Sequence, residues 1–186
     1  MMAFSRNYTT VVESVDTWDN GARAAMFEIV DNFNPTEPAA HEIPPNLKPI
    51  RDYLNFIISR LVPESSDGPS KEQVFEYWRN FGFMCFEVAI LMGVFTKPRE
   101  LHRDEIVNIL IKKQRDYGHD NIARFGRVGI AIRLHDKVAR LENLTARNTS
   151  PQNESVVDNF IDLVGYAAIG VMWEKDWYMQ EVTKAQ

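Results

Sequence analysis

A stretch near the C-terminus, ESVVDNFIDLVGYAAIGVMW from Glu154 to Trp173, constrains the fold of this chain more than any other. Its apolar residues recur at helical spacing and fill a broad face, and no charged residue occurs between Asp162 and Glu174. A helix that is apolar nearly all round is usually buried on more than one side. We therefore expect the rest of the chain to pack around this helix.

The same stretch contains a stripe of acids. Glu154, Asp158 and Asp162 recur every fourth residue, so they share one narrow side of the predicted helix. Like charges at this spacing repel one another, and a positive group should therefore lie opposite them. Acidic stripes are most often solvated helix faces, and that interpretation stays open. The apolar second half of the helix favours a cleft lined by protein, in which the acids would serve a metal or phosphate site.

The other segments also have helical spacing, and no convincing pair of strands is present, so we expect an all-α fold. The expected helices run from about 17 to 34, 50 to 61, 70 to 94, 101 to 118, 128 to 144 and 154 to 173. Asp16 or Thr17 should cap the first, Ser70 with Gln73 should form a capping box for the third, and Gly118 should end the fourth. Loops are expected at 1 to 15, 34 to 46, 64 to 69 and 145 to 153.

Composition limits the kinds of partner. With 186 residues, 45% of them hydrophobic, the chain can form one domain with a real core. A formal net charge of −5 and a pI near 5.4 give no general basic field, so we expect no direct binding to duplex DNA or RNA. The N-terminus, MMAFSRNYTTVVES, has no basic start followed by an apolar signal core, so we expect a cytoplasmic protein.

The apolar run GFMCFEVAILMGVF, residues 82 to 95, contains Cys85, which is the single cysteine, and Glu87. The run is too short to cross a membrane and Glu87 interrupts it, so we expect a core helix and no membrane association. Cys85 cannot form an intramolecular disulfide, which indicates a buried thiol in a reducing compartment. We expect Glu87 to pair with a buried Arg or Lys, and the alternative is that its carboxylate binds a metal.

Charged residues also gather on one face of the predicted helix from 128 to 144. Arg133, Asp136, Lys137 and Arg140 lie together, opposite the apolar residues of this helix. They could form an ordinary surface network in which Asp136 and Arg140 are an i,i+4 pair. The same set suits a phosphate site, because Arg offers forked donors, Lys a compact charge, and Asp can reach a cation that phosphates share. This face complements the acidic stripe, so we treat the two faces as one site.

Four short blocks occur in an order that resembles a known family. The blocks are KKxxDYG, FG, RLxDKxxRLxNL and ESxxDxxxDLxGY. The matching residues are Lys112, Lys113, Asp116, Tyr117 and Gly118; Phe125 and Gly126; Arg133, Asp136, Lys137, Arg140 and Asn143; and Glu154, Asp158, Asp162 and Tyr166. This order is similar to the phage-type nucleotide modification associated domain, a relative of the MazG-like all-α nucleoside triphosphate pyrophosphohydrolases. The resemblance covers roughly residues 101 to 173.

The resemblance implies a helical bundle that binds a nucleoside triphosphate and is commonly completed by a second subunit. The nucleotide- and metal-binding core would be residues 101 to 186, and residues 1 to 100 would be an N-terminal helical part of the same domain or an extension. A phage-encoded protein of this kind would act in the host cytoplasm. Asp162 matches the final acid of the family's ExxD element, and Asp136 matches the second acid of its ExxE element. Arg133 and Asn159 stand where each element would begin with Glu.

The resemblance also implies roles for the site residues. Mg²⁺, with Mn²⁺ as an alternative, would be held by the carboxylates Asp136, Asp158, Asp162 and Glu154, of which the last three would also be the catalytic group. Arg133, Lys137 and Arg140 would neutralise phosphate charge, and Lys113 and Tyr117 would close one end of the pocket. Tyr117 would either stack on a base or simply pack.

Three classes of function stay open at this point. The first is a magnesium-dependent pyrophosphohydrolase that converts a nucleoside triphosphate or related nucleotide to the monophosphate and pyrophosphate. The second is a catalytically silent nucleotide-binding protein that serves DNA base modification or sequesters a nucleotide. The third is a purely structural interaction protein. Small residues in the C-terminal helix, Gly165, Ala167, Ala168 and Gly170, permit close helix approach, and we expect a homo-oligomer.

Overall fold

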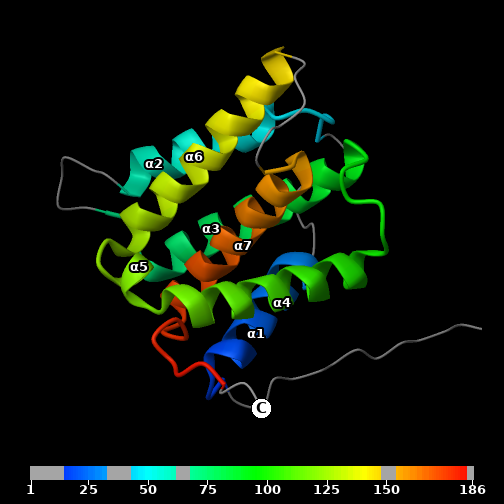
Figure 1. Ribbon diagram of the computed structural model, residues 1–186. Coiled ribbons are helices and arrows are strands. Elements are labelled where there is room, and N and C mark those ends of the chain that lie inside the picture. Colours follow the sequence, from blue (N-terminus) through cyan, green and yellow to red (C-terminus); the bar gives the residue numbers. More distant parts are fainter. Residues whose placement is uncertain (1–14, 33–42, 62–67, 148–153, 184–186) are drawn as a thin grey trace, which may run out of the picture.

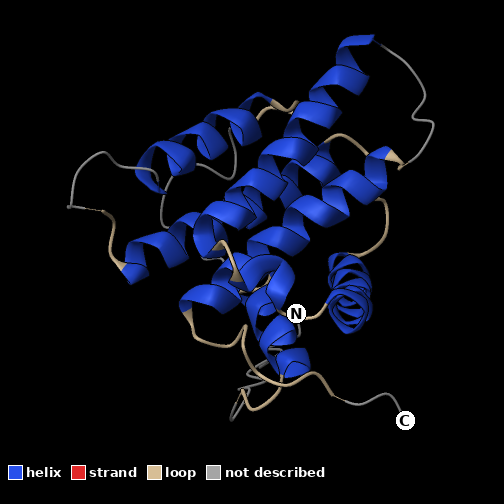
Figure 2. Ribbon diagram, turned by 60° about the vertical axis from the view of Figure 1, so that its left-hand side comes forward, coloured by secondary structure: helices blue, strands red, loops and turns tan. Residues whose placement is uncertain are grey.

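The computed structural model describes residues 15 to 32, 43 to 61, 68 to 147 and 154 to 183, and within these ranges every regular element is a helix. The helices are α1 (Trp18–Val30), α2 (Lys48–Leu61), α3 (Lys71–Leu91), α4 (Arg99–Tyr117), α5 (Asp120–Ala123), α6 (Gly126–Arg147) and α7 (Val156–Glu174). Figure 2 shows only helices and loops in the described part of the chain. The expected all-α fold is confirmed.

Three helix ends occur where the sequence predicts them. The Thr17 side chain accepts a hydrogen bond from the backbone N–H of Asn20 and caps α1. Ser70 and Gln73 form the capping box at the start of α3. Gly118, with a φ of +67°, ends α4 in a conformation that glycine adopts without a steric penalty. These local signals are therefore sufficient to place the three ends.

The start of the last helix differs from the prediction. Ser155 is its N-cap, and its side chain accepts a hydrogen bond from the backbone N–H of Asp158 while the Asp158 carboxylate accepts one from the N–H of Ser155. This reciprocal capping box fixes the start of the helix at Val156. Glu154 therefore precedes α7 and does not share a helical stripe with Asp158 and Asp162.

Other boundaries shift by a few residues. Helix α6 begins at Gly126 and continues to Arg147, so it includes the first part of the loop expected at 145 to 153. The connection between α4 and α6 contains the single helical turn of α5. Most residues of the four expected loops lie outside the described part of the chain, namely 1 to 14, 34 to 42, 64 to 67 and 148 to 153.

Helix α7 lies at the centre of the bundle, as its composition predicts. It packs against α1, α3, α4 and α6, and Figure 1 shows it between α6 and α4. Most of its residues from Asn159 to Glu174 are buried. One hydrophobic core joins α7 to residues of the N-terminal helices, including Trp18 of α1 and Trp78 of α3. The prediction of burial on more than one side is confirmed.

Small residues of α7 allow its neighbours to come close. A Cβ atom at Gly170 would lie 2.5 Å from the Trp78 ring, and one at Gly165 would lie 2.9 Å from the end of the Leu110 side chain. Ala167 and Ala168 are also fully buried. These contacts are made within one chain, so the small residues need no second subunit to explain them. The expected homo-oligomer stays a prediction that this argument no longer supports.

The structure shows the surroundings of Glu87 and Cys85. Glu87 is half-buried and forms an ion pair with Arg99. The expected pairing with a cation is therefore present, but the Arg99 side chain is 37% exposed and not buried. Cys85 is fully buried, and burial raises the pKa of its thiol well above the usual value. Helix α7 is long and apolar enough to cross a membrane by length and composition alone, but most of it is buried among the other helices, as in many protein cores.

Candidate functional site

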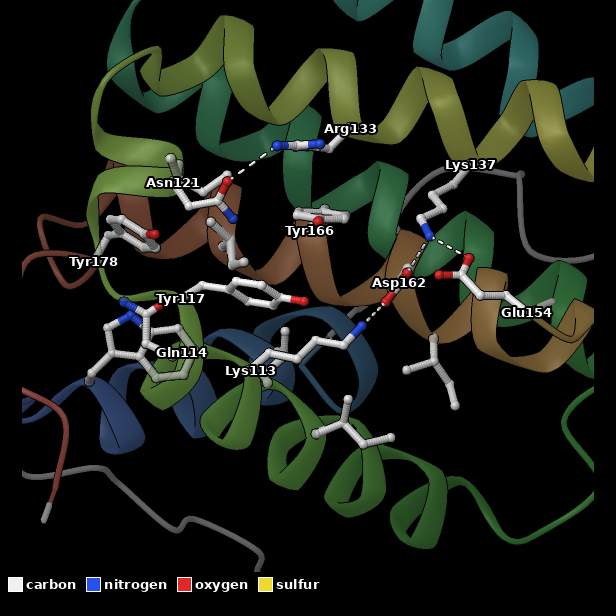
Figure 3. A pocket seen from close by; sticks show the side chains of 16 residues that line it. Lys113, Gln114, Tyr117, Asn121, Arg133, Lys137, Glu154, Asp162, Tyr166 and Tyr178 are labelled. Atoms are coloured by element: carbon white, nitrogen blue, oxygen red, sulfur yellow. Dashed lines mark hydrogen bonds and ion pairs between the residues drawn. The ribbon is translucent and has the colours of Figure 1, made fainter. Parts of the chain in front are cut away.

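A pocket of about 250 Å³ opens between α4, α5, α6 and α7 (Figure 3). Six of the nine residues predicted for the site line it: Lys113, Tyr117, Arg133, Lys137, Glu154 and Asp162. The first two come from α4 and the next two from α6, while Asp162 lies on α7. The structure therefore brings together side chains that are up to 49 residues apart in sequence.

Lys137 is the central charge at one end of the pocket. Its Nζ atom lies 2.7 Å from Asp162 Oδ2 and 2.7 Å from Glu154 Oε2. The other oxygen of Asp162 accepts a hydrogen bond from Lys113. Asp162 thus lies between two lysines, and the acids are joined by cations (Figure 3). The positive group expected opposite the acids is Lys137 of α6.

The environment of Lys137 stabilises its charged form. Burial by itself lowers the pKa of this ammonium group. Hydrogen bonds to Asp162 and Glu154, together with the charges of these carboxylates, outweigh burial and hold the pKa of Lys137 above its usual value. The ammonium group is therefore positive throughout the physiological range.

The two arginines have different surroundings. Arg140 donates to Glu154 Oε2 at 3.1 Å and to its backbone oxygen at 3.4 Å, but does not line the pocket. It therefore positions Glu154. Arg133 donates to Asn121 Oδ1 at 3.2 Å and forms no ion pair with an acid in the described part of the chain. Its exposed guanidinium is the pocket cation most available to a bound anion.

Two of the predicted metal ligands lie elsewhere. Asp158 is exposed and holds the cap of α7, and hydrogen bonds from the side chain and backbone of Ser155 lower its pKa. Asp136 is exposed on α6 and does not line the pocket. Among the residues that the structure describes, no three His, Cys, Asp or Glu side chains come close enough together to hold a metal. Glu154 and Asp162 are the carboxylates that remain at the pocket.

Asn159, which stands where the resembled family begins its ExxD element, is fully buried. Its amide donates to the backbone oxygen of Ser155 at 2.8 Å, and its own oxygen has no hydrogen-bond partner. It does not line the pocket. This position therefore contributes to the packing at the start of α7 and offers nothing to the site.

The other end of the pocket contains residues that the sequence analysis missed. They are Trp18, Gln114, Asn121 and Tyr178. Tyr166, from the matched blocks, lies between them and the charged end (Figure 3). One of them could have been recognised from the sequence. Gln114 follows Leu110 and Ile111 at helical spacing, so it is a polar residue on an apolar face of α4. Trp18 and Tyr178 show no such pattern, because both lie outside the matched blocks in the sequence. Burial raises the pKa of Tyr178 to about 12, against a smaller lowering by the nearby Gln114 amide.

No family model, curated protein sequence or solved structure matches this chain. The arrangement of side chains in the pocket is therefore the basis for an inference about function.

Proposed function

We propose that this protein binds a nucleotide, such as a nucleoside triphosphate, with its phosphates at the end of the pocket formed by Lys113, Arg133 and Lys137. The observation that supports the proposal is the convergence of these three cations, from α4 and α6, on one pocket. Lys offers a compact charge and Arg offers forked donors, and phosphate oxygens accept from both. The pocket is somewhat smaller than the ~300–1,000 Å³ typical of ligand sites, so part of the nucleotide would stay exposed.

The charge balance of the pocket explains why a metal would help. Three cations and the acids Glu154 and Asp162 line it, which leaves a net charge of 3 − 2 = +1. Lys113 and Lys137 already contact these acids, so a phosphate group must compete with carboxylates for the ammonium groups. A divalent cation that takes over the carboxylates would release both lysines. Phosphate binding and metal binding should therefore support each other.

The remaining carboxylates fit magnesium, or manganese, in this role. Magnesium usually takes one or two protein carboxylates and completes its shell with water and substrate phosphates. Glu154 and Asp162 would hold it, because both lie 2.7 Å from the same Lys137 Nζ atom and one cation can reach both. When bound, the ion would neutralise charge on the phosphates. Asp136 and Asp158 take no part in this proposal.

Hydrolysis of the nucleotide is the second candidate. The Glu154 side chain is 43% exposed at the mouth of the pocket, where a carboxylate could accept a proton from an attacking water. With one water consumed, a nucleoside triphosphate would give the monophosphate and pyrophosphate, as the resemblance to MazG-like enzymes implies. Binding ranks first because the pocket has two carboxylates in place of the four expected, and both are neutralised by cations.

Calorimetric titration tests the proposal. The purified protein is titrated with the common nucleoside triphosphates and with tripolyphosphate, each with and without magnesium. We expect binding that strengthens with magnesium. We expect Lys113→Met to weaken tripolyphosphate binding by about ten- to a hundredfold, since a charge-assisted contact is worth about 1.5–3 kcal/mol. Failure of every one of these compounds to bind would refute the proposal.

Lys112→Met is the matched control for Lys113→Met. Lys112 is the neighbouring residue on α4, has the same charge and is exposed, but does not line the pocket. Its replacement should leave the affinity for tripolyphosphate unchanged. Measuring pyrophosphate and orthophosphate separately in the same samples distinguishes binding from the hydrolase of the second candidate.

A further inference from the structure

The end of the pocket away from Lys137 and Asp162 has a different chemistry. Gln114, Tyr178 and Asn121 gather there, and Tyr117 extends between the two ends (Figure 3). Trp18, the first residue of α1, also lines the pocket and is fully buried. Arg133 reaches this end only at Asn121, to which it donates at 3.2 Å. Trp18, Gln114 and Tyr178 carry no charge, so the part of the pocket that they line suits an uncharged part of a bound molecule.

Two buried donors in this part of the pocket lack acceptors. Trp18 Nε1 and Gln114 Nε2 are both buried and make no hydrogen bond. The Tyr178 hydroxyl donates to the backbone oxygen of His119 at 3.3 Å and lies near Gln114, but Gln114 Nε2 does not reach hydrogen-bond geometry with it. An unpaired buried donor costs about 1–3 kcal/mol, so proteins seldom keep two of them beside one pocket without a use.

We infer that Trp18 and Gln114 bind the base of the nucleotide by donating hydrogen bonds to acceptors on its edge. This inference rests on the proposed function, which places the phosphates at the opposite end. Tyr117 is 66% exposed and lies between the ends, where its ring can stack on a flat base. The side chains would thus contact base and phosphates along one pocket.

The donors favour a base with a carbonyl oxygen. A carbonyl oxygen has two lone pairs and can accept from both the indole and the amide N–H. Guanine, cytosine, uracil and thymine have such an oxygen. Adenine offers only ring nitrogens, and its amino group would present a donor to donors. We therefore assign this end of the pocket to carbonyl-bearing bases in preference to adenine.

Titrations of the full chain with GTP, CTP, UTP, ATP and tripolyphosphate in the presence of magnesium test this assignment. The first three should bind more tightly than ATP. Trp18→Phe and Gln114→Met each remove one donor, and each should weaken GTP, CTP or UTP binding by about five- to tenfold while tripolyphosphate affinity stays within about twofold.

Trp78→Phe is the matched control. Trp78 is fully buried and its Nε1 atom also lacks a partner, but it does not line the pocket. The control should lose stability as Trp18→Phe does and keep its nucleotide affinities. If Trp18→Phe does not fold, Gln114→Met alone decides the matter, because it replaces a buried side chain by one of similar length.

The outcomes separate the two proposals. The assignment of the base end would be overturned if ATP bound as tightly as the other three nucleotides. It would also be overturned if both variants lost as much affinity for tripolyphosphate as for GTP. Neither result would contradict the proposed function. If neither tripolyphosphate nor any nucleotide binds, the proposed function fails and this assignment fails with it.

Discussion

Lys137 of α6 and Asp162 of α7 form an ion pair with 2.7 Å between Nζ and Oδ2, in which both side chains are largely buried. The same ammonium group contacts Glu154, which precedes α7. The pair joins the two helices at the one end of the pocket where charge is concentrated. Acids that would otherwise repel each other are therefore neutralised in the free protein, and a bound metal or phosphate must replace these partners.

Replacing Lys137 by Met should destabilise the fold and weaken phosphate binding. The substitution leaves Asp162, whose side chain is only 11% exposed, with one lysine in place of two. We expect a loss of about 1–3 kcal/mol in the free energy of unfolding, between the values for exposed and for buried pairs. Urea denaturation measures the loss, and Lys112→Met should change stability by less than about 0.5 kcal/mol. Equal stabilities of both variants would show that the pair is unimportant.

Replacing Asp162 by Asn should abolish a stabilising effect of magnesium. In the parent, magnesium at about 100 times its dissociation constant should add about 2.7 kcal/mol to the free energy of unfolding. Asp162→Asn should lose this gain, whereas Asp136→Asn should keep it, because Asp136 does not line the pocket. Without metal, Asp162→Asn should be less stable than the parent, since Lys113 and Lys137 lose a partner. Thermal melting with and without magnesium checks both expectations.

Asp158 should make stability depend on pH in acid. Its folded-state pKa is lowered below the usual 3.8, chiefly by hydrogen bonds from Ser155. A lowered carboxyl pKa gives stability that is present above about pH 3.8 and is lost as the pH falls through the folded-state pKa. Asp158→Ala should therefore be less stable than the parent at pH 7, by about 0.5–1 kcal/mol, with the difference shrinking below pH 4.

The pH series needs a control and a second measurement. Asp136→Ala removes an exposed acid from α6 without removing a helix cap, and is the control for the loss of a carboxylate. Nucleotide affinity of Asp158→Ala at pH 7 should match that of the parent. If Asp158→Ala lost nucleotide affinity without losing stability, Asp158 would have to be part of the binding site.

Replacing Gly170 by Ala should disrupt the contact between α3 and α7. The new methyl group would lie 2.5 Å from the Trp78 ring, which is rigid and fully buried. We expect a net loss of about 1–3 kcal/mol, because overpacking outweighs the better helix propensity of Ala. Gly165→Ala is the comparison, since its methyl group meets only the flexible end of Leu110 and should change stability little. Chemical denaturation of both variants measures the difference.

Much of the site was accessible from the sequence because its residues repeat at helical spacing. Lys113 and Tyr117 are one turn apart on α4, as are Arg133 and Lys137 on α6, so each pair faces one direction. Charge complementarity then suggested that the basic and acidic faces meet. The same reasoning assigned Asp158 to the site. That assignment stays a prediction. The structure shows the Asp158 carboxylate in the capping box at Ser155, because spacing defines only a helix face, whereas the cap determines what this carboxylate contacts.

The sequence by itself determined which segments are helical, where several of them end, and that the apolar C-terminal helix lies at the centre, because periodicity and capping are local properties. Only the tertiary structure decided which residues share the pocket. Trp18 and Tyr178 reach it from opposite ends of the chain, 160 residues apart, since α1 and the segment after α7 both pack at the same end of the bundle. The tertiary structure likewise decided that Glu154 and Asp162 share Lys137, because that contact depends on how α6 and α7 pack against each other.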